Sequence, residues 1–353
     1  MAKGSVFLIG AGFIGGEILE LLIQEGYQVS TLVRREAHAA ELKALGVTPV
    51  LGSLDNQELL SEQTAKHDVV IHSATADDQP SVDAVVNGLE QRAAGGKKAI
   101  YIHTSGCSEL SDHSAGDYKS DTIFHDDKPE EIDAIPADAP HREIDLSILK
   151  AREEFGQKAK IAIVLPPVIY GVGSRSKRLS IQYPTLTRFA IKHGYAAHVG
   201  KGLSVWGTVH VTDLARGYMT ILHWLEGDSS DDIHKNPYFF IENGDEYSWG
   251  EAAEQIGKAL HKLGKISDPT PKTIPEDLYG DIFGMYTAQV VGSNARNRAN
   301  RLRALGWKPQ EKSATQSLID DEIPIILQDK GEFTGYSAAV ASGAGHKKEW
   351  TGL

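Results

Sequence analysis

Short apolar runs and helical patterns alternate along the first half of the chain. The runs are continuously apolar instead of alternating with polar residues, which is typical of parallel strands covered on both faces. They span residues 5–10, 28–33, 47–51, 68–74, 99–105 and 160–167. Helical patterns lie between them at residues 15–25, 36–45 and 82–94. This order predicts an α/β fold with a doubly wound parallel sheet and right-handed crossovers.

The regular alternation is interrupted twice in the rest of the sequence. Residues 107–140 are polar and acidic without a clear period. A stretch of this length inside a compact domain predicts a lid or a binding loop. After residue 171, short strand-like pieces such as "YFFIEN" (238–243) are mixed with helical patterns. This mixture predicts a smaller α+β C-terminal lobe, and Ser248 with Glu251 predicts a capping box at the start of one helix.

The patterns divide the chain into three parts. We expect residues 1–170 to form the sheet domain, with residues 205–235 returning to it. Residues 171–204 and 236–330 are expected to form the second lobe, which would hold the substrate. The small and polar residues 331–353 are expected to form a loose tail.

Composition narrows the class of protein. Acidic residues outnumber basic ones, 48 to 36, and the formal net charge of −12 disfavours a nucleic-acid or anionic-membrane partner. The single cysteine, Cys107, excludes an intrachain disulfide and suits a reducing compartment. No run of about 18 apolar residues predicts a membrane span, and the N-terminal segment lacks the cleavage site of a signal peptide. We therefore expect a cytoplasmic globular protein.

The segment "GAGFIGG" predicts a nucleotide-binding turn. Gly10, Gly12 and Gly15 have the spacing G-x-G-x-x-G, follow an apolar run and open a helical pattern. The first glycine permits the tight turn, the second lets the backbone approach a pyrophosphate, and the third lets the helix pack on the strand. The N-terminus of the helix then faces the phosphates. The alternative is a glycine-rich turn that binds no ligand.

The end of the second apolar run selects between the two nicotinamide cofactors. Proteins that bind NAD usually carry an acid there, which accepts hydrogen bonds from the adenosine ribose. Here Arg34 and Arg35 occupy the place, and the first acid is Glu36. A guanidinium fork suits the 2′-phosphate of NADP, so we favour NADP over NAD. The alternative is that both arginines only begin a solvated helix.

Several motifs together resemble the short-chain dehydrogenase/reductase superfamily, in its extended or atypical branch near the NAD-dependent epimerases and dehydratases. Besides the glycine turn they are "LGSLDN" (51–56), "VVIHSA" (69–74), "YIHTSG" (101–106), "LPPVIYGVG" (165–173), "VHVTDLA" (209–215) and "LGWKP" (305–309). They occur in the family's order over most of the chain. The resemblance implies a Rossmann fold and a small-molecule substrate, and it raises the prospect of a homodimer.

The resemblance also implies which residues hold the cofactor. Phe13 and Ile14 belong to the glycine turn, and Ser53 with Leu54 would flank the adenine. The remaining residues would line the dinucleotide groove or close over the nicotinamide. The groove residues are Ser73, Ala74 and Thr75, and the nicotinamide residues are Pro166, Val168 and Ile169.

The family's catalytic Tyr-x-x-x-Lys pair is absent between the fifth and sixth apolar runs. Members usually polarise the substrate oxygen with Ser or Thr and exchange the proton through Tyr, whose pKa the Lys lowers. Ser105 matches the first position, and its neighbour Thr104 is the alternative. Counting back from the sixth run places His141 where the Tyr belongs and Asp145 where the Lys belongs, within a few residues.

Two interpretations of residues 141–145 remain open. In the first, His141 transfers a proton near neutral pH, while Asp145, one helical turn on, orients it or accepts from a ribose hydroxyl. In the second, Pro140 and the acids merely form an ordinary helix start. His125, Asp126 and Asp127 fit no standard metal site, so we expect a solvated loop there and no metal.

Three functions fit these observations. The first is an NADP-dependent oxidoreductase or epimerase of a carbonyl or alcohol, with Ser105 and His141 in catalysis and hydride transfer supplied by the cofactor. The second is a catalytically silent protein that senses the NADP redox state or serves as a scaffold. The third is a non-redox isomerase or cyclase that uses His141 as acid and base. We favour the first.

Overall fold

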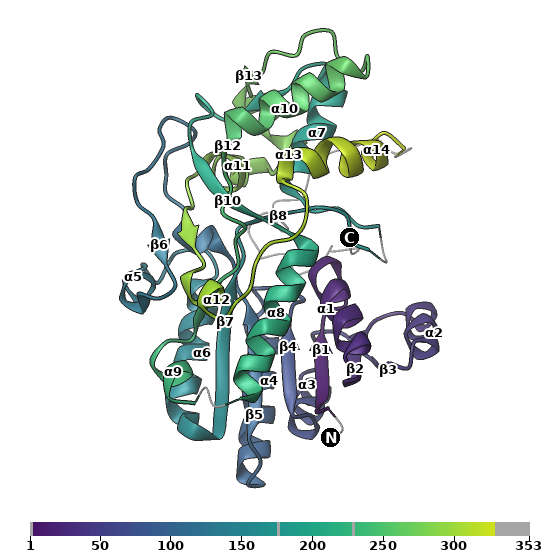
Figure 1. The fold of residues 1–353 in the computed structure, drawn as a ribbon, viewed down its shortest axis with the longest axis vertical. Helices are drawn as coiled ribbons and strands as arrows, with labels where there is room; N and C mark the ends of the chain where they lie inside the picture. The colour runs from purple at the N-terminus through teal and green to yellow at the C-terminus, as the bar shows by residue number, and fades with distance from the viewer. Residues whose placement is uncertain (1–2, 175–176, 228–229, 329–353) are drawn as a thin grey trace.

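The computed structural model describes residues 3–174, 177–227 and 230–328 (Figure 1). A parallel sheet flanked by helices forms the lower part of the view in Figure 1, and a second lobe lies above the carboxyl edge of that sheet. The expected tail, residues 331–353, lies outside the described residues. Within the described ranges, no helix combines the length and the apolar character needed to cross a bilayer.

Seven strands form the main sheet in the order β11-β7-β5-β4-β1-β2-β3, and neighbouring strands are parallel. They are β1 (Ser5–Ile9), β2 (Gln28–Val33), β3 (Thr48–Leu51), β4 (Val69–His72), β5 (Ala99–Thr104), β7 (Ala159–Leu165) and β11 (Tyr238–Phe240). The predicted doubly wound parallel sheet is confirmed. The strand order reverses between β1 and β4, and in such sheets ligands bind at the carboxyl ends of the strands beside the reversal.

The edge strand β11 differs from the prediction. The sequence pattern places "YFFIEN" in the second lobe, but Tyr238–Phe240 pairs with β7 of the main sheet. The buried carboxylate of Asp126 accepts a hydrogen bond from the backbone N–H of Phe240 at 3.0 Å, which supports the strand on its other side. A three-residue strand whose partners are distant in sequence carries no periodicity of its own, so the pattern did not place it.

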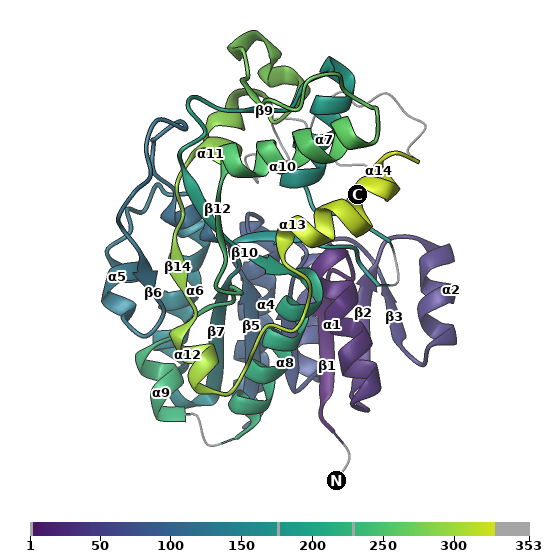
Figure 2. The ribbon, with the colours of Figure 1, turned by 45° about the horizontal axis from the view of Figure 1, so that its top comes forward.

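Helices cover both faces of the sheet (Figures 1 and 2). On one face α3 (Gln57–Lys66) packs against α4 (Gln79–Ala94), which in turn contacts α6 (Arg142–Phe155). On the other face α1 (Phe13–Gln24) packs against α8 (Val211–Glu226). The remaining helices of this domain are short and lie toward its ends: α2 (Glu36–Ala44), α9 (Ser230–Lys235) and α12 (Asn300–Ala304).

The buried stripe of α8 explains why residues 211–226 lie against the sheet domain. Leu214, Tyr218, Ile221 and Leu225 are fully buried and recur at helical spacing. The Tyr218 hydroxyl also lies 2.6 Å from Thr104 Oγ1 at the end of β5. This contact occupies the hydroxyl of Thr104, the alternative to Ser105 in the sequence analysis.

The second lobe combines small sheets with helices, as its mixed pattern predicts. Its strands are β8 (Val168–Tyr170), β9 (Ala197–His198), β10 (Val205–His210), β12 (Glu246–Ser248) and β13 (Lys272–Thr273). The sequence analysis assigns the residues of β8 and β10 to the sheet domain, but these strands pair with each other, and β10 also pairs with β12, in a separate sheet. Its helices are α7 (Gln182–His193), α10 (Trp249–Lys262), α11 (Thr287–Gly292), α13 (Ala314–Ser317) and α14 (Ile323–Ile326), with short 3₁₀ and π turns between them. The capping box is confirmed, because Ser248 Oγ accepts from Glu251 N–H and Glu251 Oε2 accepts from Ser248 N–H.

The polar segment 107–140 is tied down by the second lobe instead of forming an open lid. It contains β6 (Phe124–His125), which pairs with β14 (Asn297–Arg298), and the short helix α5 (Pro129–Asp133). Asp112 accepts hydrogen bonds from the backbone and side-chain amides of Asn294. Asp126 is fully buried, and its carboxylate accepts hydrogen bonds from two backbone N–H groups. The expectation of a solvated loop is therefore wrong at this residue.

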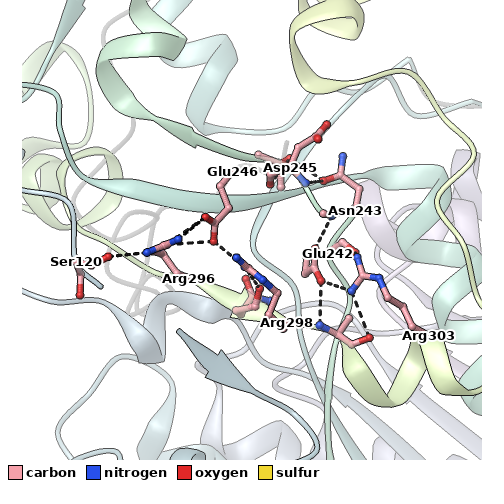
Figure 3. Close-up of polar contacts among 12 residues, drawn as sticks. Ser120, Glu242, Asn243, Asp245, Glu246, Arg296, Arg298 and Arg303 are labelled. Atoms are coloured by element: carbon pink, nitrogen blue, oxygen red, sulfur yellow. Dashed lines mark hydrogen bonds and ion pairs between the residues drawn. The ribbon is translucent and has the colours of Figure 1, made fainter. Parts of the chain in front are cut away.

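A network of ion pairs and hydrogen bonds joins this segment to residues 242–246 and to residues 296–303 (Figure 3). Arg296 donates to the carbonyl oxygen of Ser120 at 2.8 Å and to Glu246 at 2.8 Å. Arg298 donates to the same carboxylate at 2.7 Å. Glu242, just after β11, accepts from the backbone N–H of Ala299 at 2.9 Å and pairs with Arg303 (Figure 3). The network fixes the second lobe against the sheet's edge.

The buried carboxyl of Glu322 predicts a measurable pH dependence of stability. Burial raises its pKa from 4.5 to about 7, although Gly171 N–H and Ser317 Oγ donate to it and lower the pKa. A carboxyl whose folded-state pKa is raised stabilises the fold below its unfolded pKa, and this contribution is lost as the pH rises to about 7. The free energy of unfolding of Glu322→Gln relative to wild type should therefore increase by about 3 kcal/mol between pH 4.5 and pH 8.

Chemical denaturation of both proteins at several pH values measures this difference. Asp320→Asn removes an exposed carboxylate two residues away and is the matched control, for which we expect a change below about 0.5 kcal/mol. A constant difference between Glu322→Gln and wild type across the pH range would contradict the prediction.

Candidate cofactor and catalytic site

The glycine turn is closed by contacts between the ends of β1 and β4. Gly10 has a φ of 99°, and a Cβ there would lie 2.5 Å from the Cα of Ala74. A Cβ on Gly15 would overlap the carbonyl oxygen of Gly10 and lie 2.5 Å from Ser73 Oγ. Ser73 Oγ donates to the same carbonyl oxygen at 2.9 Å. The first and third glycines are therefore required by close packing.

Gly12 is different because its α-carbon faces open space. Among the atoms of the described residues, only Nη1 of Arg178 would lie within 4 Å of a Cβ at this position, at 3.6 Å. Gly12 caps α1, whose first residues are Phe13 and Ile14. An accessible glycine at a helix N-terminus is the cradle that a pyrophosphate requires, so these residues fit a bound dinucleotide.

The other residues proposed for the cofactor lie at the carboxyl ends of neighbouring strands. Ser53 and Leu54 follow β3, and Ser53 N–H donates to Asn56 Oδ1 at 2.8 Å, which forms a tight turn before α3. Thr75 follows β4, where its Oγ1 accepts from Asp77 N–H. Pro166, Val168 and Ile169 lie between β7 and β8 or within β8. The parallel sheet brings these segments to one edge.

Arg34 and Arg35 follow β2 and are exposed. Arg178 belongs to the second lobe. Its pKa is lowered mainly by burial and then by the positive charges of Arg35 and Arg34. One guanidinium therefore lies at Gly12 and two follow the neighbouring strand β2, in a protein whose formal net charge is −12. Such a concentration of positive charge favours an anionic ligand at this place.

His141 lies between a serine and an aspartate. Its Nε2 lies 2.6 Å from Ser108 Oγ, and its Nδ1 lies 2.5 Å from Asp77 Oδ1. The residue has a φ of 67° and is the N-cap residue of α6. Burial lowers the pKa of His141, but the hydrogen bond and the charge of Asp77, with the charge of Asp145, raise it overall. The side chains of His141 and Asp77 remain about one-sixth exposed.

The sequence analysis missed Ser108 and Asp77. Both residues come shortly after the carboxyl end of a central strand, β5 for Ser108 and β4 for Asp77. Polar residues in that position on adjacent parallel strands meet at one sheet edge, which is the signal that could have identified them. The sequence analysis instead followed the family's spacing, which points to Ser105 and Asp145.

Ser105 and Asp145 belong to a second, buried polar cluster. Ser105 Oγ donates to Glu109 Oε1 at 3.2 Å, and Asp145 Oδ1 lies 3.8 Å from His103 Nε2. Arg142 Nη1 lies 3.7 Å from Glu109 Oε2. Burial, followed by the charge of Asp145, raises the pKa of Glu109, and burial also raises the pKa of Asp145. Asp77, and not Asp145, makes the hydrogen bond that orients His141, so this part of the interpretation of residues 141–145 is corrected.

Metal binding has no support in this arrangement. Across residues 3–174, 177–227 and 230–328, no group of three or more His, Cys, Asp or Glu side chains is placed to hold a metal ion. Asp126, the buried acid of the former candidate cluster, uses its two carboxylate oxygens to accept from Phe240 N–H and Arg301 N–H, each at 3.0 Å.

The fold and this sheet edge define an NAD(P)-binding protein of the Rossmann class. Residues 10–135 match a family model described as NAD(P)H-binding. The chain is 30% identical to the oxidase ucsJ of Acremonium sp over 94% of its own length and 99% of the relative's. It therefore belongs to the same family as this oxidase, and its N-terminal part carries the NAD(P)H-binding region of that family model.

Other similar proteins align with most of the chain. An uncharacterised protein of Schizosaccharomyces pombe is 29% identical, with 90% of this chain and 98% of that protein covered. Two solved structures have the same fold at low identity. They are yeast methylglyoxal/isovaleraldehyde reductase Gre2 with NADPH (TM-score 0.61, 16% identity, 92% of this chain and 98% of that chain) and Thermotoga maritima UDP-glucose 4-epimerase with UDP-glucose (TM-score 0.63, 17% identity, 91% and 98%).

Proposed function

We propose that the protein is an NADP(H)-dependent oxidoreductase that interconverts a carbonyl and an alcohol on a small molecule. The observation that carries this proposal is the chain of contacts Asp77–His141–Ser108 at the carboxyl edge of β4 and β5. It supplies a proton donor and acceptor at the place where relatives use a Tyr-Lys pair. The similar oxidase and the similar reductase are named for redox reactions, which supports this choice over an epimerase or a non-redox isomerase.

In this proposal the three residues act as a proton relay. In the reductive direction the nicotinamide, when bound, supplies the hydride to the carbonyl carbon. Ser108 donates its hydroxyl proton to the carbonyl oxygen and takes a proton from Nε2 of the His141 imidazolium. Asp77 accepts from Nδ1–H and stabilises the charged ring, which explains the raised pKa of His141. The products are the alcohol and the oxidised cofactor.

The buried cluster serves a different purpose in this proposal. Ser105 and Asp145 are at most 5% exposed, and Ser105 donates to the buried Glu109. A carboxyl in the place of the family's Lys offers no cation to activate a tyrosine, and its raised pKa favours the neutral acid. We therefore place Ser108, instead of Ser105, in contact with the substrate oxygen, and we give Ser105 and Asp145 a supporting role beneath His141.

The preference for NADP is part of the proposal. Arg34 and Arg35 are exposed directly after β2, where the adenosine ribose of a Rossmann cofactor lies. An arginine fork pairs with a phosphate through two hydrogen bonds, so these residues favour the cofactor that carries a 2′-phosphate.

Incubation with NADPH and a panel of aldehydes, ketones and quinones tests the function. We expect loss of the NADPH absorbance at 340 nm with at least one carbonyl, and stoichiometric alcohol by mass spectrometry. Cofactor binding is measured separately by fluorescence. Tight NADPH binding without turnover across the panel would favour the silent sensor, while conversion of a substrate without consumption of NADPH would favour a non-redox isomerase.

A further inference from the structure

A loop from the second lobe is pinned onto the first helix of the nucleotide-binding turn. Ser174 donates from its backbone N–H and its Oγ to Glu17 Oε1 of α1, at 2.7 and 2.8 Å. Glu17 is 5% exposed, so its carboxylate is largely shielded from water. Gly173, next to Ser174, donates from its backbone N–H to the carbonyl oxygen of Arg178 at 2.8 Å. This hydrogen bond ties Arg178 to the residues that are held on α1.

The guanidinium of Arg178 lies over the glycine that the diphosphate must approach. Its Nη1 is 3.6 Å from the Cβ position of Gly12, on the open side of the turn. Arg178 is half-buried there, and it lies close enough to Arg34 and Arg35 to be repelled by them. An anion bound beside Arg178 would offset the repulsion from Arg34 and Arg35.

We propose that Arg178, beside Gly12, clamps the cofactor's diphosphate at the glycine turn, so that the second lobe contributes directly to dinucleotide binding. The N-terminus of α1 would contact the phosphates through its backbone N–H groups, and Arg178 would contact them through its guanidinium. The inference rests on the proposed binding of a nicotinamide cofactor and deepens it, because it separates two anion subsites. Arg178 belongs to the diphosphate subsite, which NAD and NADP share, whereas Arg34 belongs to the 2′-phosphate subsite.

Binding measurements on Arg178→Met test the clamp without any catalytic assay. Loss of a charge-assisted hydrogen bond to a phosphate costs about 1.5–3 kcal/mol, which corresponds to about 10- to 100-fold in Kd. We expect this loss in equal measure for NADPH and NADH by fluorescence titration. Arg34→Met should weaken NADPH alone, and Arg178→Lys should recover part of the affinity because it keeps the charge but not the fork.

Lys177→Met is the matched control, because Lys177 is an exposed cation next to Arg178 in the same loop. We expect it to leave both affinities unchanged, and thermal unfolding of each variant verifies its fold. Three results would overturn the clamp: unchanged affinity in Arg178→Met, tighter binding, which would make Arg178 an obstacle, or a loss confined to NADPH. If the wild type binds NADH but not NADPH, the proposed cofactor preference fails, and the clamp is still decided by the NADH titration.

Discussion

Replacing His141 by glutamine should lower kcat for carbonyl reduction by about 10²- to 10⁴-fold, the usual contribution of a positioned acid or base. Glutamine keeps a polar group between Ser108 and Asp77 but cannot carry a proton at neutral pH. The Kd of NADPH should change by less than about twofold, because the imidazole touches Ser108 and Asp77 and not the glycine turn. Steady-state kinetics and a fluorescence titration on the same preparation measure both quantities.

Three further variants separate a chemical role of His141 from a structural one. The charged form of His141 is retained to higher pH because Asp77 raises the pKa of the imidazole, so kcat for reduction should fall as the pH rises through that pKa. Asp77→Asn should move this fall to lower pH. Ser108→Ala should lower kcat more than Ser105→Ala does. An unshifted pH profile in Asp77→Asn, or the reverse order of the two serine variants, would remove the relay from the mechanism.

Replacing Gly15 by alanine should abolish binding of both NADPH and NADH, or prevent the chain from folding. The new Cβ would overlap the carbonyl oxygen of Gly10 and crowd Ser73 Oγ, and the first of these atoms is backbone that cannot rotate away. Helix α1 must then move away from β1, which opens the turn that faces the phosphates. We expect a loss of at least about 100-fold in cofactor affinity and a cost of several kcal/mol in the free energy of unfolding.

Gly16→Ala is the neighbouring control for this prediction. A Cβ on Gly16 would meet nothing within 4 Å, and the residue lies inside α1. Alanine should therefore stabilise the protein by about 0.5–1 kcal/mol, through its better helix propensity, and leave cofactor affinity intact. Calorimetry and titration of the two variants side by side give the answer, and wild-type cofactor affinity in Gly15→Ala would refute the account of the turn.

The sequence predicts the structural features that depend on residues close together in the chain. The glycine spacing, the apolar runs of the central strands and the capping box at Ser248 are local patterns, and each has a local physical cause. The nucleotide-binding fold and the family could therefore be predicted from the sequence.

The sequence was a poor guide where residues distant in the chain meet. Asp77, Ser108 and His141 follow three different elements, and no local pattern shows that their side chains converge. The family's spacing pointed to Asp145, but a residue one helical turn after the cap faces the sheet interior here, where it meets His103. Similarly, the polar neighbours of Asp126 predict a solvated acid. In the structure, its carboxylate accepts hydrogen bonds from the backbone N–H groups of Phe240 and Arg301.

The position of β11 in the sequence, more than 70 residues after β7, has a consequence for co-translational folding. Six strands of the main sheet have been translated once the ribosome reaches residue 165. One edge of β7 stays unpaired until β11 (Tyr238–Phe240) has also been translated. Exposed strand edges promote pairing between chains, and folding of large domains exposes such intermediates to aggregation. Nascent chains of this protein should therefore depend on chaperones most while residues 166–240 are being translated, and truncation before β11 should yield insoluble material.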